Sequence, residues 1–309
     1  MKEAKGKKEK EQNERSKRTK QKLKKRRTKD KQEKVIEKML KKEEKKLLKM
    51  ALKQDLDKGD ITSALLEKKK CGARIIAKED CVLSGVEEAV FLFNERNCGT
   101  KVLKKDGKKV NKGTIVMRIN GLNRSVLEAE RTALNFLGRM SGVATMSNKA
   151  KKIAGENCKI ALTRKVAPLN LLFDKKSAEH AGIMIHRRNL HYGVLIKENH
   201  LAFEGITKLV EKARKKGFRK IEVECENLLE VKEAVNCGAG VVMLDNFSVK
   251  NAEQAIKYIR KKGSTQIEIS GGINFNNLRR YASLKPDFIS LGILTHSVKN
   301  VNFSLEIVK

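Results

Sequence analysis

Aromatic residues are scarce in this chain of 309 residues: tryptophan is absent, and aromatics make up only 4%. Proteins that bind single-stranded nucleic acids stack bases on aromatic side chains, so this composition offers little for that mode. There is no run of eighteen apolar residues, and we therefore expect no transmembrane helix and no membrane partner. The basic N-terminus lacks the apolar stretch of a secretory signal, so we do not expect one.

Cysteine pairs spaced as CxxC are missing as well. The six cysteines, at positions 71, 81, 98, 158, 225 and 237, show no spacing typical of metal ligands. Free thiols of this kind are typical of a reducing compartment. We therefore expect a cytoplasmic protein.

Positive charge is present in excess, with a net value of +33. Residues 1–34 carry 17 Lys and Arg against 6 Asp and Glu, with almost no apolar residues, which predicts a disordered or marginally helical basic arm. This arm could contact nucleic acid or another polyanion. It could equally be a solvated extension of a chain that is rich in lysine throughout, and both interpretations stay open.

Mixed helix and strand patterns follow the arm. Apolar spacing predicts helices over 35–53 and 125–140, while 73–120 alternates like short strands interrupted by a helix at 87–97. Together these elements predict an N-terminal α/β sandwich domain at 35–133.

A regular alternation of strands and helices begins after about residue 155. Apolar runs occur at 159–165, 193–199, 220–227, 240–246, 266–272 and 287–292, with helical stretches between the later ones. This alternation predicts a parallel sheet. Each run ends in polar residues, which favours a barrel with its site at one mouth over an open doubly wound sheet. We therefore expect an α/β barrel domain at 134–297.

The predicted barrel mouth is rich in cations. Arg164, Lys165, His186, Arg187 and Lys197 lie at or just after strand ends. Clustered cations repel one another unless an anion lies between them. Arg can bind carboxylate or phosphate with two parallel hydrogen bonds, and Lys supplies a point charge. The pattern therefore predicts a pocket for a polyanion.

Two acidic residues, Glu224 and Asp245, end successive strands and should face the same mouth. Carboxylates at these positions could hold ribose hydroxyls or a divalent ion such as Mg²⁺. A salt-bridge network to Lys197 would give the same pattern, so the residues alone leave both interpretations open.

A glycine-rich turn, SGGINFNNLRR (270–280), joins a strand to a helix. Glycines let backbone N–H groups approach a phosphate, and late strands of α/β barrels often build such a site, here together with Gly292. An ordinary glycine-containing turn is the alternative.

Several motifs in one order resemble a known family. They are GDITS (59–63), ERTALNFLGRMSGVAT (130–145), TRK (163–165), HRRNLHYGVLIKENH (186–200), VECENLLE (223–230), MLDNFS (243–248), SGGI (270–273) and SLGILTHS (290–297). This set is similar to quinolinate phosphoribosyltransferases, the carboxylating nicotinate-nucleotide pyrophosphorylases among the type II phosphoribosyltransferases. The resemblance covers about residues 50–309.

The resemblance implies a fold and a reaction. The fold would be an N-terminal α/β sandwich, an open seven-stranded α/β barrel, and a segment at 298–309 that returns to the sandwich. The protein would form a homodimer, or an oligomer of dimers, with shared sites. The reaction would join quinolinate and phosphoribosyl pyrophosphate, with Mg²⁺, to give nicotinate mononucleotide, pyrophosphate and CO₂ for NAD synthesis.

The resemblance also implies roles for individual residues. Arg131 of the partner subunit, Arg164, His186 and Arg187 would bind the quinolinate carboxylates, and Lys165 and Lys197 would lie between quinolinate and the pyrophosphate. Glu224 and Asp245 would hold the ribose hydroxyls and Mg²⁺, so Lys165, Lys197, Glu224 and Asp245 would be the catalytic set. The 5′-phosphate would be bound by Ser270, Gly271, Gly292 and His296.

Two segments depart from the pattern of the family, TRKVAPLN (163–170) and AGIMIHR (181–187). Leu169 replaces a turn glycine, and Ile183 and Ile185 replace residues near the substrate ring. A related enzyme acting on another aromatic acid therefore remains an alternative, as does nucleic-acid binding through the basic arm. The sequence leaves open whether 166–170 closes as a lid.

Overall fold

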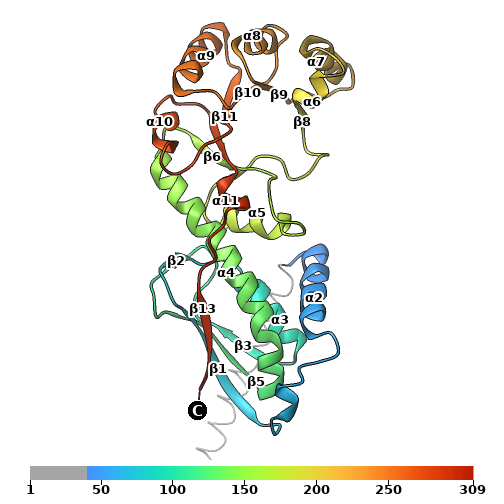
Figure 1. Ribbon diagram of the computed structural model, residues 1–309, viewed down its shortest axis with the longest axis vertical. Coiled ribbons are helices and arrows are strands. Elements are labelled where there is room, and N and C mark those ends of the chain that lie inside the picture. The colour runs from blue at the N-terminus through green and yellow to red at the C-terminus, as the bar shows by residue number, and fades with distance from the viewer. Residues whose placement is uncertain (1–39, 309) are drawn as a thin grey trace, which may run out of the picture.

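The computed structural model describes residues 40–308, and the basic arm expected at 1–34 lies outside the described residues. The described chain forms two units, an antiparallel sandwich and a parallel barrel (Figure 1). The long helix α4 (Asn123–Ala154) runs from the first unit into the second. Within this described part, no helix has both the length and the apolar composition of a membrane span.

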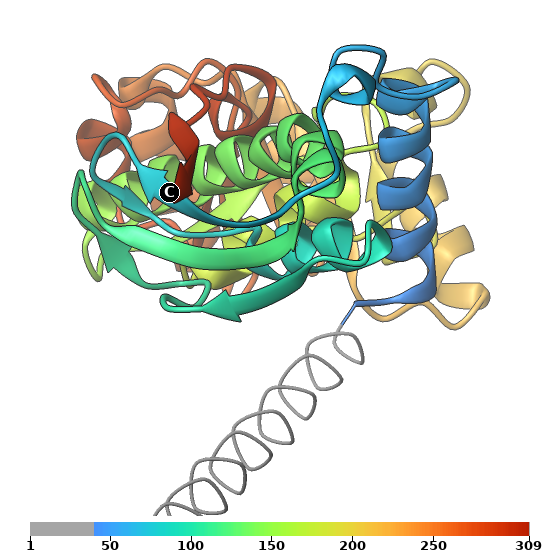
Figure 2. The same ribbon diagram turned by 90° about the horizontal axis from the view of Figure 1, so that it is seen from below.

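The sandwich unit is built on an antiparallel sheet with the strand order β13-β1-β5-β3. Its strands are β1 (Lys70–Ala77), β3 (Gly99–Val102), β5 (Ile115–Leu122) and β13 (Phe303–Val308), with a separate pair β2 (Cys81–Val82) and β4 (Lys109–Val110). The helical layer contains α2 (Lys42–Leu56), the short helix η1 (Ser63–Leu65), α3 (Val86–Glu95) and part of α4. Helix α2 packs on α3 and α4 beside the sheet (Figure 2).

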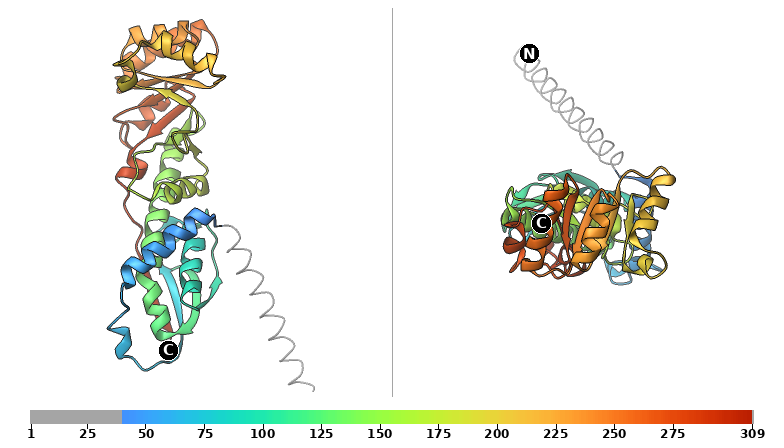
Figure 3. Two further views of the ribbon diagram at one scale, coloured as in Figure 1. Left: turned by 90° about the vertical axis from the view of Figure 1, so that its right-hand side faces the viewer. Right: turned by 90° about the horizontal axis from the view of Figure 1, so that it is seen from above.

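Helix α4 is much longer than the stretch 125–140 that its apolar pattern predicts. The helix continues through two internal glycines, Gly138 and Gly142, and the chain leading to β13 crosses the helix at these two positions. A Cβ on Gly138 would lie 2.8 Å from the Val301 carbonyl oxygen, and one on Gly142 would lie 2.4 Å from that of Lys299. The glycines thus permit a close backbone approach, and β13 continues to the sandwich end of the molecule (Figure 3).

The barrel unit is a seven-stranded sheet with the order β7-β6-β12-β11-β10-β9-β8, and all its pairings are parallel. The strands are β6 (Lys159–Leu162), β7 (Met184–Ile185), β8 (Val194–Ile196), β9 (Ile221–Cys225), β10 (Val241–Asp245), β11 (Gln266–Ser270) and β12 (Phe288–Leu291). The helices are α5 (Leu171–His180), α6 (Glu198–Leu201), α7 (Ile206–Lys215), α8 (Leu228–Asn236), α9 (Val249–Lys262), α10 (Leu278–Ala282) and α11 (Ile293–His296). Each apolar run predicted from the sequence contains one strand.

The barrel is open between β7 and β8, which are the two edges of the sheet although they are neighbours along the chain. Strand β7 is two residues long, too short for its pattern to predict a strand. Buried residues such as Val223, Val242 and Ile267 form the core under the outer helices, as expected for a sheet covered on both faces. The expected fold class, an α+β sandwich joined to an open seven-stranded α/β barrel, is confirmed.

Candidate active site

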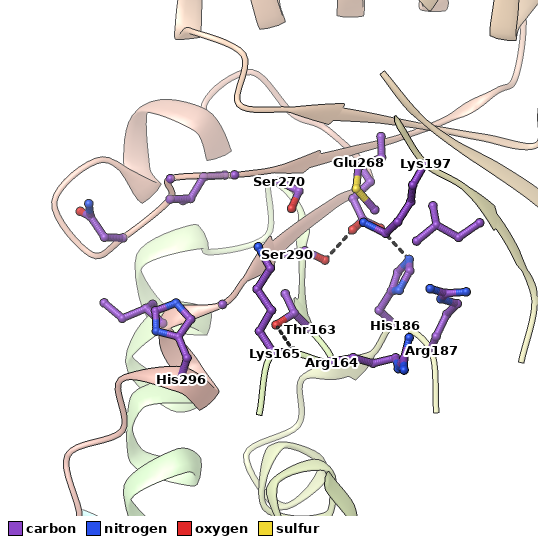
Figure 4. A pocket seen from close by; sticks show the side chains of 18 of the residues that line it. Thr163, Arg164, Lys165, His186, Arg187, Lys197, Glu268, Ser270, Ser290 and His296 are labelled. Carbon is purple, nitrogen blue, oxygen red and sulfur yellow. Dashed lines mark hydrogen bonds and ion pairs between the residues drawn. The ribbon is translucent and has the colours of Figure 1, made fainter. Parts of the chain in front are cut away.

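A cavity of about 570 Å³ lies at the carboxyl ends of the barrel strands. Most of the site residues predicted from the sequence line it (Figure 4): Arg164, Lys165, His186, Arg187, Lys197, Ser270, Gly271, Gly292 and His296. They come from segments that follow five different strands, so the open barrel brings together side chains that are more than a hundred residues apart. Figure 4 places His186 and Arg187 at one end of the cavity and His296 at the other, with Lys165 between them.

Two neighbouring cations, Arg164 and Arg187, line one end of the cavity. Burial lowers the pKa of Arg187, and the neighbouring Arg164 lowers it further. Within the described chain, the Nε atom of Arg187 is buried without a hydrogen-bond partner. A buried guanidinium nitrogen without an acceptor is costly, and this part of the cavity is therefore suited to an anionic group.

Lys175 adds a cation that the sequence analysis missed. It lies on α5, only 5% exposed, and its Nζ donates a hydrogen bond to the carbonyl oxygen of Arg187. Burial and the adjacent Arg164 lower the pKa of this amine to about 8. The residue sits between Asp174 and Lys176 in a polar stretch, so no local signal distinguishes it from a surface lysine.

His186 is bound to two carboxylates that the sequence analysis also missed. Its Nε2 lies 2.7 Å from Glu222 Oε2 and 3.3 Å from Glu268 Oε2. Burial lowers the pKa of His186, but the hydrogen bond to Glu222 and the charge of Glu268 outweigh burial and raise it. Burial and the nearby Glu222 raise the pKa of Glu268 to about 7. The sequence did contain a signal for them, since Glu222 and Glu268 each lie within an otherwise largely apolar strand, β9 and β11.

The predicted acidic pair lies beside the residues that line the cavity. Glu224 accepts a hydrogen bond from Lys197 Nζ, and Asp245 accepts one from Asn246 Nδ2 at 2.6 Å. Burial raises the pKa of Glu224, and the charge of Asp245 raises it further. The ion pair with Lys197 is the alternative that the sequence left open, and it is present.

Glu224 on β9 and Asp245 at the end of the neighbouring strand β10 supply the carboxylate oxygens that Mg²⁺ prefers. Magnesium is commonly held by one or two carboxylates together with substrate phosphates rather than by an all-protein cage. Glu224 and Asp245 therefore fit an ion that is completed by oxygens of a bound substrate.

The glycine turn lies at the other end of the cavity. Gly271 and Gly272 have φ values of +85° and +61°, which a residue with a side chain rarely adopts. A Cβ on Gly271 would lie 2.3 Å from Asn246 Oδ1, and one on Gly292 would lie 3.0 Å from the His296 ring. Asn246 thus fills the space that a side chain at Gly271 would need, and Gly271, Gly272 and Gly292 line the cavity without side chains.

Other predicted positions lie away from the cavity. Arg131 is exposed on α4 and does not line the cavity formed by its own chain. Ile183 is buried in the barrel core and borders a separate hollow with Lys159 and Asp287, while Ile185 lines neither. The substitutions at 183 and 185 are thus outside the lining of the cavity. Leu169 is 70% exposed and has a φ of +64°, the left-handed conformation that favours the glycine it replaces.

Comparison with known proteins covers nearly all of the described chain. A model for the N-terminal domain of quinolinate phosphoribosyl transferase matches residues 60–141, and one for the C-terminal domain matches 143–306. The probable nicotinate-nucleotide pyrophosphorylase [carboxylating] of Methanocaldococcus jannaschii is 40% identical over 271 residues, which is 84% of this chain and 95% of that protein. The Bacillus subtilis protein of the same name is 34% identical, covering 82% and 90%.

Solved structures agree with these matches. The nicotinate-nucleotide pyrophosphorylase from Francisella tularensis has a TM-score of 0.82 and 35% identity, over 86% of this chain and 96% of that one. Human nicotinic acid phosphoribosyltransferase, with 12% identity and a TM-score of 0.56, shares the fold alone. The two domain models and the relatives above 30% identity show that this chain belongs to the quinolinate phosphoribosyl transferase family.

Proposed function

We propose that this protein transfers the phosphoribosyl group of phosphoribosyl pyrophosphate to quinolinate with loss of CO₂, giving nicotinate mononucleotide and pyrophosphate for NAD synthesis. The observation that carries the proposal is the single cavity in which Arg164, Arg187 and Lys197 meet. Both substrates are multiply charged anions, and a cavity lined by cations compensates their charge when they are brought together.

The two ends of the cavity suit different substrates. Quinolinate, with two carboxylates, fits the end with Arg164, His186 and Arg187. The 5′-phosphate of the other substrate fits the end with Ser270, Gly271, Gly292 and His296, where glycines line the cavity. Lys165 and Lys197 then lie between the acid and the pyrophosphate.

The chemistry follows from this arrangement. The ring nitrogen of quinolinate attacks the anomeric carbon as pyrophosphate leaves, through a transition state with oxocarbenium character. Lys165 and Lys197 stabilise the charge that develops on the leaving group, and holding both substrates in one cavity supplies much of the remaining acceleration. CO₂ is then lost from the carbon next to the ring nitrogen, because the new pyridinium charge stabilises the carbanion, and this carbon takes a proton from water to give nicotinate mononucleotide.

Three further features belong to the proposal. Glu224 and Asp245 would bind the ribose hydroxyls and hold Mg²⁺, which neutralises pyrophosphate charge when it is bound. Arg131 of the partner subunit would reach the acid in a homodimer, since Arg131 is remote from the cavity of its own chain. A cytoplasmic location is supported by the cysteines, all six of which are unpaired within residues 40–308.

The test is a product assay with quinolinate, phosphoribosyl pyrophosphate and Mg²⁺, in which nicotinate mononucleotide and CO₂ are measured. Nicotinate in place of quinolinate is the control, and other aromatic 2-carboxylic acids test the alternative that the substrate is a different acid. Product from nicotinate and none from quinolinate would refute the carboxylating reaction.

A further inference from the structure

Two buried carboxylates converge on one nitrogen at the floor of the cavity. Glu222 and Glu268 belong to different strands, β9 and β11, and are only 8% and 1% exposed. Both approach the same atom, Nε2 of His186, at 2.7 and 3.3 Å. Burying two acids is unfavourable unless each is compensated by a hydrogen bond or a charge, so their position beside one imidazole requires a reason.

The hydrogen-bonding capacity of histidine gives that reason. Nε2 must carry a hydrogen to donate to Glu222, and in a neutral ring Nδ1 would then be a lone-pair acceptor. Among residues 40–308, Nδ1 has no hydrogen-bond partner while the side chain lines the cavity. A lone pair there would repel an anionic substrate, whereas a second proton would make Nδ1 a charged donor.

The charged groups around His186 favour the second proton. Glu222 from β9 and Glu268 from β11 attract it, while Arg187, the next residue in the chain, opposes it. Glu268 also accepts a hydrogen bond of 2.5 Å from the Ser290 hydroxyl on β12, which fixes this carboxylate in place. His186, Glu222 and Glu268 could geometrically hold a metal ion, but an imidazole nitrogen that binds a metal carries no hydrogen, whereas Nε2 lies at hydrogen-bond distance from Glu222.

We propose that Glu222 and Glu268 are positioning residues that hold His186 with both ring nitrogens protonated, so that its Nδ1–H donates to a carboxylate of the acid substrate. The proposal rests on the proposed function for the identity of that substrate. Glu222 does not line the cavity, and Glu268 lines it with only 1% of its surface exposed, so both acids act through the orientation and charge of one imidazole.

Nuclear magnetic resonance of the full-length protein labelled with ¹⁵N in histidine tests the charge state directly. His186→Gln identifies the signals of this ring. We expect both nitrogens of His186 to have imidazolium shifts at about pH 7.5, above the usual histidine pKa of about 6.5. Shifts of a neutral imidazole in the wild type would overturn the proposal, and this result does not depend on activity or on the folding of any variant.

Kinetics of Glu222→Gln and Glu268→Gln provide the second test. Loss of a charge-assisted hydrogen bond to substrate corresponds to a rise of roughly tenfold or more in KM for the acid. We expect this rise in both variants, with little change in KM for phosphoribosyl pyrophosphate and a neutral His186 ring. Glu204→Gln makes the same substitution at a more exposed carboxylate, which pairs with Lys212 elsewhere on the barrel, and should change neither value.

The outcomes separate the two proposals. Equal KM rises for both substrates, or an imidazolium signal that persists in both variants, would contradict the positioning role. Absence of any product from quinolinate in the wild type would refute the proposed function instead, while the spectrum of His186 would still decide its charge state.

Discussion

Replacement of Asp174 by Asn tests whether a buried ion pair holds α4 against the cavity rim. Asp174 lies on α5 with no exposed surface. Arg139 on α4 donates from Nε and Nη2 to its two carboxylate oxygens at 2.9 and 2.8 Å. The same Nη2 donates to the carbonyl oxygen of Thr295, whose hydroxyl donates to the carbonyl oxygen of Lys165 at 2.6 Å. The pair thus connects the long helix to a segment that carries a predicted catalytic lysine.

The expected loss is large because Asp174→Asn keeps the shape and removes the charge. The amide offers one acceptor instead of two and leaves the Arg139 guanidinium uncompensated in a poorly hydrated site. Breaking a buried pair in this way costs about 3–5 kcal/mol. With an unfolding entropy of about 2.1 cal/mol/K for each of 309 residues, the melting temperature should fall by about 5–8 °C.

Thermal unfolding followed by circular dichroism measures the change. The matched control is Glu179→Gln on the same helix, which breaks an exposed pair with Arg188 at 3.5 Å and should cost less than about 1 kcal/mol. The double variant Arg139→Met with Asp174→Leu removes both charges and should unfold at a higher temperature than Asp174→Asn. A melting temperature for Asp174→Asn equal to that of the control, or no recovery in the double variant, would refute the reasoning.

Three other predictions concern pH, the glycine turn and the shared site. Because burial lowers the pKa of Lys175 to about 8, the folded protein binds fewer protons than the unfolded chain between that value and the usual lysine pKa of about 10.4. The wild type should therefore gain stability relative to Lys175→Met as the pH rises through this window. If the urea midpoints of wild type and Lys175→Met differ by the same amount at about pH 7 and at about pH 9.5, the prediction is contradicted. Gly271→Ala should raise KM for phosphoribosyl pyrophosphate roughly tenfold or more. The control is Gly217→Ala, which has a similar φ of +84° and nothing within 4 Å of the added Cβ, and which should leave KM unchanged. Equal kinetics of the two variants would argue against a phosphate site at Gly271. Mixing Arg131→Ala and Lys165→Ala subunits should restore part of the activity, and no recovery in a verified mixed dimer would count against a borrowed arginine.

Local patterns were sufficient for much of the fold. Each of the six apolar runs after residue 155 contains a barrel strand, because a strand covered on both faces requires a continuous apolar stretch. Polar residues at the ends of these runs, such as Arg164 and Lys197, line the cavity because the carboxyl ends of parallel barrel strands meet at one mouth. The length of α4 could not be predicted, since its two glycines look like interruptions until the chain that crosses them is in place.

The sequence by itself determined the alternation of strands and helices, the cationic strand ends and the glycine turn, because each is encoded by residues next to one another in the chain. Only the tertiary structure decided that Glu222 and Glu268 meet at His186, and that Lys175 lies against Arg187. These contacts depend on the order of strands in the sheet and on the packing of α5. Neither is recorded in the local pattern of a strand or helix, and both are set when distant segments bury their apolar faces together.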